Sequence, residues 1–557
     1  MIRKLLPCIL FSLITGWAFN LISYTIRTTW PATHDIHLTN TAIMDRLSHP
    51  LFFSLHKNDL ISSIAGIIIT ILICLYHTAM EGNTRIGEEH GSAAWATPAD
   101  MKPFTDPDTH YNLQFTHTEK LSLNTQHTHR NLNALIMGAS GSGKTRGYVI
   151  PNMLSLSTSS KPVSFAITDP KGELYKHTAA YMKKAGYTIK QLNLIDMASS
   201  SRFNPLAYIN PTDPEGAIMR LTENIITNTG GKNDKNDFWD KASKSLLNAL
   251  IAWVYFFEDK ENITLNTVTT MISRMQASEE NENAMSSIDN LFAEAREWIH
   301  DYHNDPESYD NNAARTLDGL AFASSQYRAY EQGAGETKKS IITTLANLTT
   351  GLQTSRIKSL LNTDDMELDN ISEQKTIIYI MISDTEKTFN FLAAIFYQCL
   401  FENSIYNADH TATGTLTQPL HVFLDEFANI GKIPGFPTLI ATMRSRNISC
   451  SIILQTLAQI KSMYKDDWET ILANCDSKLF LGGNDQTTTE YFSKTLGNQT
   501  INITTTSETK GINGSWSIQH SKQKRELLTP DELGRLKNTD CIYILRGLKP
   551  FHSTKIN

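Results

Sequence analysis

The sequence contains the run Gly138-Ala139-Ser140-Gly141-Ser142-Gly143-Lys144-Thr145, which matches the P-loop pattern G-x-x-x-x-G-K-[ST] at every fixed position. The apolar run 133–137 before it predicts a buried strand, and residues 146–156 after it predict a helix. In this order the glycines let backbone N–H groups and the helix N-terminus point at phosphate. Lys144 would reach the β and γ phosphates of ATP, and the Thr145 hydroxyl would coordinate Mg²⁺. The run therefore predicts an ATP and Mg²⁺ site, with a flexible Gly/Ser turn as the alternative.

A second element of the same chemistry is expected at 421–426, where an apolar strand pattern ends in Asp425 and Glu426. Such a Walker B strand would place Asp425 to hold Mg²⁺ through water and Glu426 to orient or deprotonate the attacking water. An Asp-Glu pair at a strand end is common in proteins. Its position downstream of a P-loop, in a chain of alternating strands and helices, makes this interpretation specific.

Asp169 lies at the carboxyl end of the strand predicted at 163–167, which is the first strand after the P-loop helix. The carboxyl ends of parallel strands gather ligands at one edge of the sheet, so Asp169 is expected either to contact Mg²⁺ or to face an adjacent subunit. A turn made by Pro170 and Gly172 is the alternative.

The apolar pattern divides the chain into segments. Strands predicted at 133–137, 163–167 and 188–195 alternate with helices, which indicates an α/β fold with a parallel sheet covered on both faces. Apolar residues then recur three and four apart, which predicts an all-helical inserted domain, until strands resume at 376–382, 421–426, 449–454, 477–481 and 541–545. The expected segments are a membrane anchor (1–80), a linker and start of the cytosolic body (81–130), the nucleotide domain's first part (131–210), the insert (211–362) and the nucleotide domain's second part (363–557).

Two stretches near the amino terminus, 5–26 and 60–80, carry no charged side chain and are long enough to cross a bilayer as helices. A cleavable signal is the alternative for the first, since a basic lead precedes it. Because a P-loop needs cytosolic ATP, the body after Met80 is expected to be cytosolic, which leaves 27–59 as a small external loop.

Composition sets wider limits. The 557 residues are too many for one core, and 41% hydrophobic with 19% charged residues excludes wholesale disorder. A net charge of −7 argues against a protein that coats nucleic acid with its whole surface, although a local basic loop or pore lining would be invisible in that total. The six cysteines show no C-x-x-C spacing, which fits buried thiols in a reducing compartment and no zinc site.

Residues 498–522 are rich in Thr, Ser, Asn and Gly and predict a long surface loop or hairpin that contains Trp516. Such a segment is either functional, facing the pore of a ring-forming motor, or a solvated excursion. Both interpretations remain open at this point.

Taken together, the chain resembles the coupling-protein ATPases of type IV secretion systems over nearly its whole length. The resemblance rests on motifs that stand in the family's order. They are the two amino-terminal spans, His90-Gly91-Ser92-Ala93-Ala94-Trp95-Ala96, the P-loop, Thr168-Asp169-Pro170-Lys171-Gly172-Glu173-Leu174, Phe203-Asn204-Pro205-Leu206, Gly335-Glu336-Thr337, Phe423-Leu424-Asp425-Glu426-Phe427 and Leu528-Thr529-Pro530-Asp531-Glu532-Leu533.

This resemblance implies a RecA-like nucleotide domain interrupted by a helical domain, six subunits in a ring under the bacterial inner membrane, and ATP hydrolysis between neighbours. It implies relaxase-linked single-stranded DNA (the relaxosome) and secretion-channel components as partners. Arg444 matches the family's arginine finger best, with a solvated pair of Arg444 and Arg446 as the alternative. Gln455 resembles the family's glutamine that senses the γ-phosphate, and a satisfied polar residue at a strand end is its alternative.

The leading hypothesis is a two-pass inner-membrane ATPase that moves DNA toward a conjugation channel. One alternative is a coupling ATPase that delivers protein effectors, which would share the same motor. Another is a docking platform whose nucleotide site only holds the ring together, and the intact P-loop and Glu426 argue against it. Two spans and a large helical insert argue against a small-molecule P-loop kinase.

Overall fold

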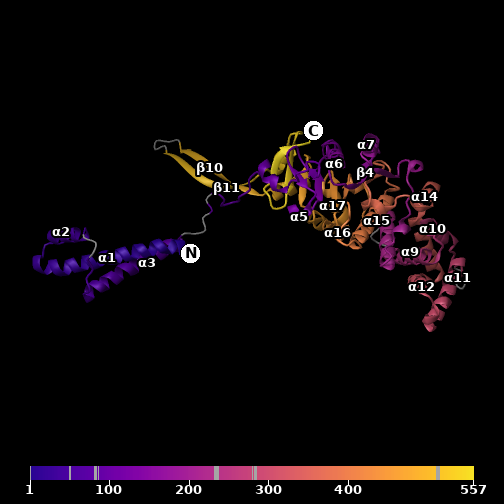
Figure 1. The fold of residues 1–557 in the computed structure, drawn as a ribbon, viewed down its shortest axis with the longest axis horizontal. Coiled ribbons are helices and arrows are strands. Elements are labelled where there is room, and N and C mark those ends of the chain that lie inside the picture. The colour runs from indigo at the N-terminus through magenta and orange to yellow at the C-terminus, as the bar shows by residue number, and fades with distance from the viewer. Residues whose placement is uncertain are drawn as a thin grey trace. The chain divides into compact units, whose positions relative to one another are not determined.

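The computed structural model describes residues 2–48, 52–80, 85, 87–230, 237–278, 280, 285–509 and 515–556. The chain divides into two compact units (Figure 1). The first comprises Met1–Ser92 and Thr500–Lys524, and the second comprises Ala93–Gln499 and Arg525–Asn557.

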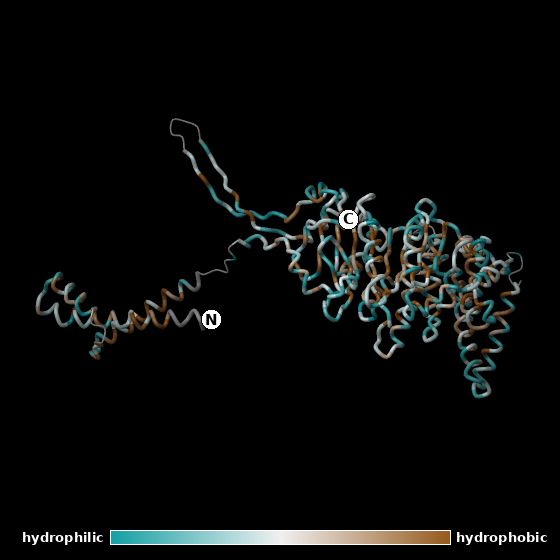
Figure 2. The backbone as a smooth tube through the Cα atoms, turned by 45° about the horizontal axis from the view of Figure 1, so that its top comes forward, coloured by the Kyte–Doolittle hydropathy of each residue, from teal (hydrophilic) through white to brown (hydrophobic). Residues whose placement is uncertain are grey.

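Two apolar helices dominate the first unit. They are α1 (Ile2–Thr33) and α3 (Lys57–Met80), and α2 (Ile36–Leu47) lies between them in the chain. Within α1 and α3, Cys8–Thr33 and Lys57–His77 are long and apolar enough to cross a membrane. Figure 2 shows the hydrophobic residues along both helices. In an 18-residue apolar stretch of each span, only 28% and 11% is buried in the structure, so most of the apolar surface there faces outward.

Small residues let α1 and α3 pack closely. A Cβ atom added to Gly16 would lie 2.6 Å from Cγ1 of Ile67, and one added to Gly66 would lie 2.8 Å from Cγ of Phe19. Larger side chains at either position would push the helices apart. Close packing of this kind is how helices associate in a bilayer, where no hydrophobic force drives them together.

A buried polar cluster lies just beyond the expected end of the α1 apolar run at Ile26. The carboxylate of Asp59 is fully buried and accepts hydrogen bonds from Arg27 Nη2 at 3.0 Å, Ser23 Oγ at 2.9 Å and Ser54 Oγ at 2.7 Å. The helix runs on through Arg27 to Thr33, because arginine is a good helix former, and the Arg27 charge is paired with Asp59. The expected loop 27–59 therefore contains the end of α1 and all of α2.

The polar stretch 498–522 forms a β-hairpin, one of its two expected forms. Strands β10 (Asn498–Thr509) and β11 (Ser515–Glu526) make a two-stranded sheet. Trp516 and Ile518 are exposed on β11. Lys522 forms an ion pair with Glu89, and the backbone N–H of His90 donates to Thr500 Oγ1 at 2.9 Å.

The second unit is built on a nine-stranded sheet with the order β13-β12-β9-β3-β8-β7-β4-β6-β5. Its seven strands from β9 to β5 are parallel, and β12 and β13 are antiparallel at one edge. The strands are β3 (Ala134–Met137), β4 (Ser164–Pro170), β5 (Thr188–Asn193), β6 (Thr376–Ile382), β7 (Leu420–Leu424), β8 (Ile448–Leu454), β9 (Ser477–Phe480), β12 (Asp540–Leu545) and β13 (Phe551–Thr554). Each expected strand is present, and the expected parallel sheet is correct except at this edge.

Two hydrophobic cores lie on opposite faces of this sheet. In β3, Ala134 and Ile136 join one core while Leu135 and Met137 join the other, as alternation along a strand requires. Helices α6 (Ile150–Ser157) and α7 (Glu173–Lys184) cover the first face, and α15 (Asn390–Asp409) and α17 (Leu457–Tyr464) cover the second. A sheet buried on both faces explains why its strands are continuous apolar runs.

Shorter elements complete the second unit. A small antiparallel sheet pairs β1 (Asn112–Gln114) with β2 (Lys120–Ser122), so part of the expected linker is packed into the first core. The remaining short helices are α4 (Pro98–Met101), α5 (Thr125–Thr128), α16 (Phe436–Thr442), α18 (Trp468–Ala473), α19 (Gln486–Leu496) and α20 (Pro530–Gly534).

Helices fill the chain between β5 and β6. They are α8 (Pro214–Thr229), α9 (Asp237–Phe257), α10 (Leu265–Arg274), α11 (Ser287–Asn304), α12 (Asn311–Glu331), α13 (Gly335–Leu348) and α14 (Ser355–Leu360). The side-chain amide of Asn224 on α8 donates to Ala394 O at 3.1 Å and to Gln398 Oε1 at 2.6 Å, both on α15. These helices share one hydrophobic core with the sheet, so the boundaries of a separate inserted domain stay a prediction.

Replacing Gly319 of α12 by alanine is expected to destabilise this helical region. An added Cβ would overlap the ring of Phe256 on α9, and overpacking of this kind costs about 1–3 kcal/mol, partly offset by the better helix propensity of alanine. Thermal unfolding followed by circular dichroism should show a lower midpoint. Gly534→Ala is the matched control, because nothing lies near a Cβ at that helical position. Equal midpoints for the two variants would show that α9 and α12 can move apart without lowering the free energy of unfolding.

Candidate nucleotide site

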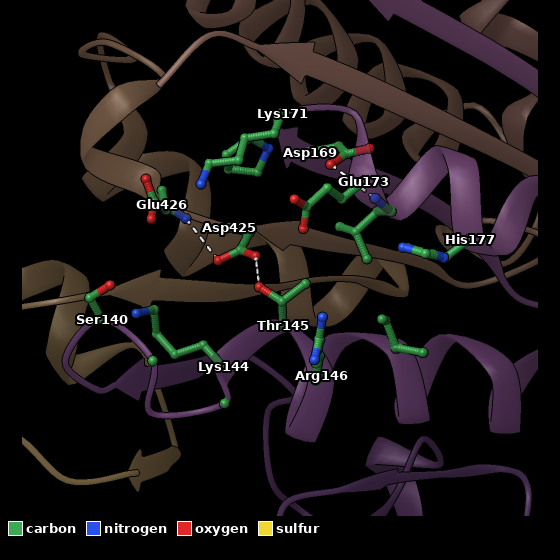
Figure 3. Close-up of a pocket in the computed structure, with 15 residues that line it drawn as sticks. Ser140, Lys144, Thr145, Arg146, Asp169, Lys171, Glu173, His177, Asp425 and Glu426 are labelled. Carbon is green, nitrogen blue, oxygen red and sulfur yellow. Dashed lines mark hydrogen bonds between the residues drawn. The ribbon is translucent and has the colours of Figure 1, made fainter. Parts of the chain in front are cut away.

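The carboxyl ends of β3, β4 and β7 meet at one edge of the sheet and line a cavity of about 360 Å³ (Figure 3). Ser140, Gly141, Gly143, Lys144 and Thr145 of the P-loop line one side. The turn after β4 lines another side, and Asp425 and Glu426 after β7 complete it. Three segments far apart in the sequence thus form a single site.

The P-loop backbone adopts conformations that need glycine. Gly141 and Gly143 have φ angles of +76° and +92°, in the left-handed region. Gly138 and Ala139 form the back of the loop, and their carbonyl oxygens accept hydrogen bonds from Lys144 Nζ at 2.8 Å and 3.2 Å. Burial lowers the pKa of the Lys144 ammonium, while the charges of Asp425 and Glu426 oppose that shift. The lysine therefore sits folded against its own loop.

The helix after the P-loop begins as a π-helical turn. Thr145–Val149 form this turn, and α6 continues from Ile150. The sequence predicted one regular helix over 146–156. The P-loop also has a partner near the carboxyl terminus, since Lys555 Nζ donates to Ser142 O at 3.0 Å. No sequence signal pointed to that contact, because the two residues lie at opposite ends of the second unit's chain.

Thr145 and Asp425 contact each other directly. The Thr145 hydroxyl donates to Asp425 Oδ2 at 2.6 Å, and Asp425 Oδ1 accepts from the backbone N–H of Glu426 at 3.0 Å. Burial raises the pKa of Asp425 to about 6, against the opposing effects of the Thr145 hydrogen bond and the Lys144 charge. A hydroxyl and a carboxylate at this distance are the hard oxygen donors that Mg²⁺ prefers, directly or through water. The pair fits that ion.

Glu426 is held from both sides by amides. Its φ angle of +50° is unusual for a residue other than glycine. Gln455 Nε2 donates to its Oε1 at 3.1 Å, and Asn429 Nδ2 donates to its Oε2 at 2.8 Å. Gln455, expected to contact the γ-phosphate, is therefore in contact with Glu426 instead, and its role as a sensor stays a prediction. Asn429 was missed, although its position three residues after Glu426 places it in the same turn.

Asp169 holds the turn after β4 together. Its carboxylate is 1% exposed and accepts hydrogen bonds from the backbone N–H groups of Leu174 at 3.2 Å and Tyr175 at 2.8 Å. Burial raises the pKa of this carboxyl, against the effect of those hydrogen bonds. Because both oxygens cap α7, the structure favours the turn interpretation over direct contact with Mg²⁺.

The two arginines after α16 have different environments. Arg446 binds Asp409 through Nε at 2.7 Å and Nη2 at 2.9 Å. Arg444 is exposed, lies outside the P-loop cavity, and makes no hydrogen bond or ion pair with any residue that the structure describes. The alternative of two solvated arginines is therefore wrong for Arg446. The finger role of Arg444 stays a prediction.

A parallel sheet with a P-loop after β3 and an Asp-Glu pair after β7 defines a P-loop nucleotide-binding protein of the RecA-like class. The family model described as "Type IV secretory system Conjugative DNA transfer" matches residues 109–557. The chain belongs to this family, and the coupling-protein resemblance seen in its motifs is confirmed.

Known proteins of the same kind are similar over most of this chain. Protein VirD4 of Agrobacterium fabrum is 23% identical over 435 residues, which cover 76% of this chain and 58% of that protein. A conjugal transfer protein TraG of Escherichia coli is 27% identical over 421 residues, covering 71% of this chain and 60% of that protein. The chain thus spans somewhat over half the length of these curated relatives.

Solved structures show the same fold. The conjugative coupling protein TrwBdeltaN70 has a TM-score of 0.58 at 14% identity, covering 84% of this chain and 96% of that one. TrwB has also been solved with the non-hydrolysable ATP analogue ADPNP (TM-score 0.58, 14% identity, 86% and 96% covered) and with ADP and Mg²⁺ (TM-score 0.57, 14% identity, 84% and 94% covered). These matches confirm the RecA-like α/β fold.

Proposed function

We propose that the protein is a membrane-anchored ATPase that couples ATP hydrolysis to the transfer of relaxase-linked single-stranded DNA into a type IV secretion channel. The observation that carries this proposal is the meeting of Lys144, Thr145, Asp425 and Glu426 in one cavity, with the Glu426 carboxylate fixed by two amides. Similarity to proteins named for conjugal transfer supports DNA as the transferred substrate.

Each residue of the site has a distinct part in hydrolysis. The backbone N–H groups of residues 138–145 and the Lys144 ammonium bind the phosphates, and Lys144 exchanges its two carbonyl partners for phosphate oxygens. Thr145 and Asp425 would hold Mg²⁺, which neutralises phosphate charge when bound. Glu426 orients the attacking water and accepts its proton, and Gln455 and Asn429 keep the carboxylate in place.

Arg444 would complete the site of a neighbouring subunit. An exposed arginine outside its own cavity suits delivery in trans, where it would stabilise charge on the transferring phosphoryl group. This arrangement requires a head-to-tail ring, which the family resemblance suggests is a hexamer. The two apolar helices would anchor that ring in the bacterial inner membrane, with the ATPase body in the cytoplasm near the relaxosome and the channel components.

Nucleotide binding is expected to weaken below about pH 6. Asp425 must be ionised to hold Mg²⁺, and its pKa of about 6 exceeds the ordinary value of 3.8. The Asp425 carboxyl therefore binds its proton more tightly in the folded state than in the unfolded chain. As pH rises from about 4 to 6, loss of that proton lowers folding stability. Affinity for ADP with Mg²⁺, measured by fluorescence anisotropy, should fall up to about tenfold per pH unit below 6.

Asp425→Asn provides the control for that pH series. ADP itself titrates in the same range, and the variant shows this contribution alone because it lacks the carboxyl. A wild-type profile parallel to that of the variant would contradict the assignment of the titration to Asp425.

A coupling ATPase for protein effectors is the second candidate, since it would use the same cavity. A docking platform without turnover is a third, which the fixed Glu426 carboxylate argues against. The test is steady-state ATP hydrolysis by the full chain in detergent micelles, with and without single-stranded DNA, beside Lys144→Ala. DNA-stimulated turnover that rises steeply with protein concentration and is absent in the variant supports the proposal. Turnover indifferent to DNA favours protein cargo, and no turnover in the wild type favours the platform.

A further inference from the structure

Lys171 has a backbone conformation that its side chain disfavours. It lies in the turn between β4 and α7 with a φ angle of +92°, although it carries a Cβ atom. Strained residues of this kind persist only where the surrounding structure holds them, and they cluster at functional sites. The turn alone does not require a lysine at position 171, because a glycine would make the same turn without strain.

The surrounding structure fixes this turn from both ends. The backbone N–H of Lys171 donates to Ile382 O of β6 at 3.3 Å, and Asp169 caps α7 immediately after the turn. A Cβ added to Gly172 would lie 3.3 Å from Sδ of Met381, so the backbone is packed tightly against β6. The direction in which the Lys171 side chain leaves the turn is therefore fixed.

The Lys171 side chain extends into the P-loop cavity. Figure 3 shows it reaching from the end of β4 toward Glu426, on the other side of Asp425 from Lys144. Its ammonium pairs with Asp384 at 3.4 Å, and the two side chains are 58% and 38% exposed. An ion pair with that distance and exposure contributes little and can be exchanged for a stronger partner. A phosphate oxygen is such a partner.

We propose that Lys171 is a second cation for the terminal phosphate of a nucleoside triphosphate, and that it leaves Asp384 to bind it. This inference rests on the proposed ATPase function and adds a residue to that site. Lys144 approaches the phosphates from the P-loop, and Lys171 approaches from the opposite wall. ADP lacks the phosphate that Lys171 would reach, so the pair with Asp384 forms again after hydrolysis and release.

This change of partner by Lys171 would couple nucleotide binding to the helical region. Asp384 lies between β6 and α15, and the side chain of Asn390 at the start of α15 donates to Asn429 O at 2.7 Å. The same helix binds Asn224 of α8 through Gln398. Release of Asp384 by Lys171 therefore acts on the segment that leads into α15, which packs against α8.

Binding of ADPNP and of ADP, each with Mg²⁺, to the full chain in detergent tests this inference. Lys171→Ala should weaken ADPNP binding about tenfold and leave ADP binding unchanged, as expected for loss of one charge-assisted contact to the terminal phosphate. Asp384→Asn should instead strengthen ADPNP binding about two- to threefold, because the lysine no longer has a competing partner. Lys171→Gly relieves the backbone strain while removing the cation, so it should reproduce the loss for ADPNP with unchanged or higher thermal stability.

Opposite signs for the two substitutions distinguish this role from a structural one. If Lys171→Ala and Asp384→Asn change ADPNP binding in the same direction, the ion pair only supports the turn and the inference is overturned. Equal losses for ADPNP and ADP in Lys171→Ala overturn it as well. Wild-type binding of neither nucleotide would overturn the proposed function and this inference together, whereas intact wild-type binding with an unchanged ratio in Lys171→Ala overturns the inference alone.

Discussion

Glu426→Gln is expected to bind ATP as the wild type does and to hydrolyse it about 10²–10⁴ times more slowly. Glutamine has the same length and can stay between Gln455 and Asn429, but it cannot accept a proton from water. In the wild type, both neighbours donate to the Glu426 carboxylate. In the variant, one of their two side-chain amides must therefore rotate by about 180° so that its oxygen accepts from the new NH₂ group. Single-turnover hydrolysis and equilibrium binding of ATP, measured on the same preparation, separate the two effects.

Lys144→Ala is the comparison for this variant. It should lose binding as well as turnover, because the lysine contacts the phosphates in the ground state. Gln455→Leu should fall between the wild type and Glu426→Gln, with normal binding and a smaller loss of turnover, since Asn429 still holds one oxygen of Glu426. Wild-type turnover in Glu426→Gln would show that this carboxylate only stabilises the fold.

Much of the fold could be predicted because its strands are buried on both faces. A strand of a covered parallel sheet is an unbroken apolar run, as in β6 and β8, and such runs stand out from their surroundings. The direction of β12 could not be predicted, since an apolar run reads the same for either orientation of the strand. The extension of α1 past Arg27 was also missed, because the prediction followed the uncharged run, whereas arginine continues a helix readily.

The site divides in the same way. Lys144, Thr145, Asp425 and Glu426 belong to motifs whose spacing reflects the chemistry, and the structure brings all four to one cavity. The contacts that position them join residues distant in sequence, such as Gln455 with Glu426, and no local pattern encodes such pairs. Asp169 differs from these residues. Its motif predicts contact with Mg²⁺ or an adjacent subunit, whereas in the structure both of its oxygens accept hydrogen bonds from the first turn of α7.

Arg444→Ala is expected to lower ATP turnover about 10³–10⁵-fold in the assembled protein and to leave nucleotide binding intact. An arginine finger stabilises charge that develops only during phosphoryl transfer, so its loss does not weaken binding of the ground state. Arg446→Ala is the matched control on the same turn. It loses the ion pair with Asp409 and some stability but should keep most of its turnover, because that side chain is already engaged within its own subunit.

Mixing two inactive variants tests whether Arg444 acts on a neighbour. Lys144→Ala copies supply an intact arginine, and Arg444→Ala copies supply an intact P-loop. In a head-to-tail ring formed from equal amounts, roughly one interface in four combines both intact halves, so part of the turnover should return. Within a single subunit no such rescue is possible, because neither chain has both residues. Turnover that stays at the level of the separate variants would therefore contradict action of Arg444 on a neighbouring subunit. Equal losses in Arg444→Ala and Arg446→Ala would assign both residues to the stability of the turn that carries them.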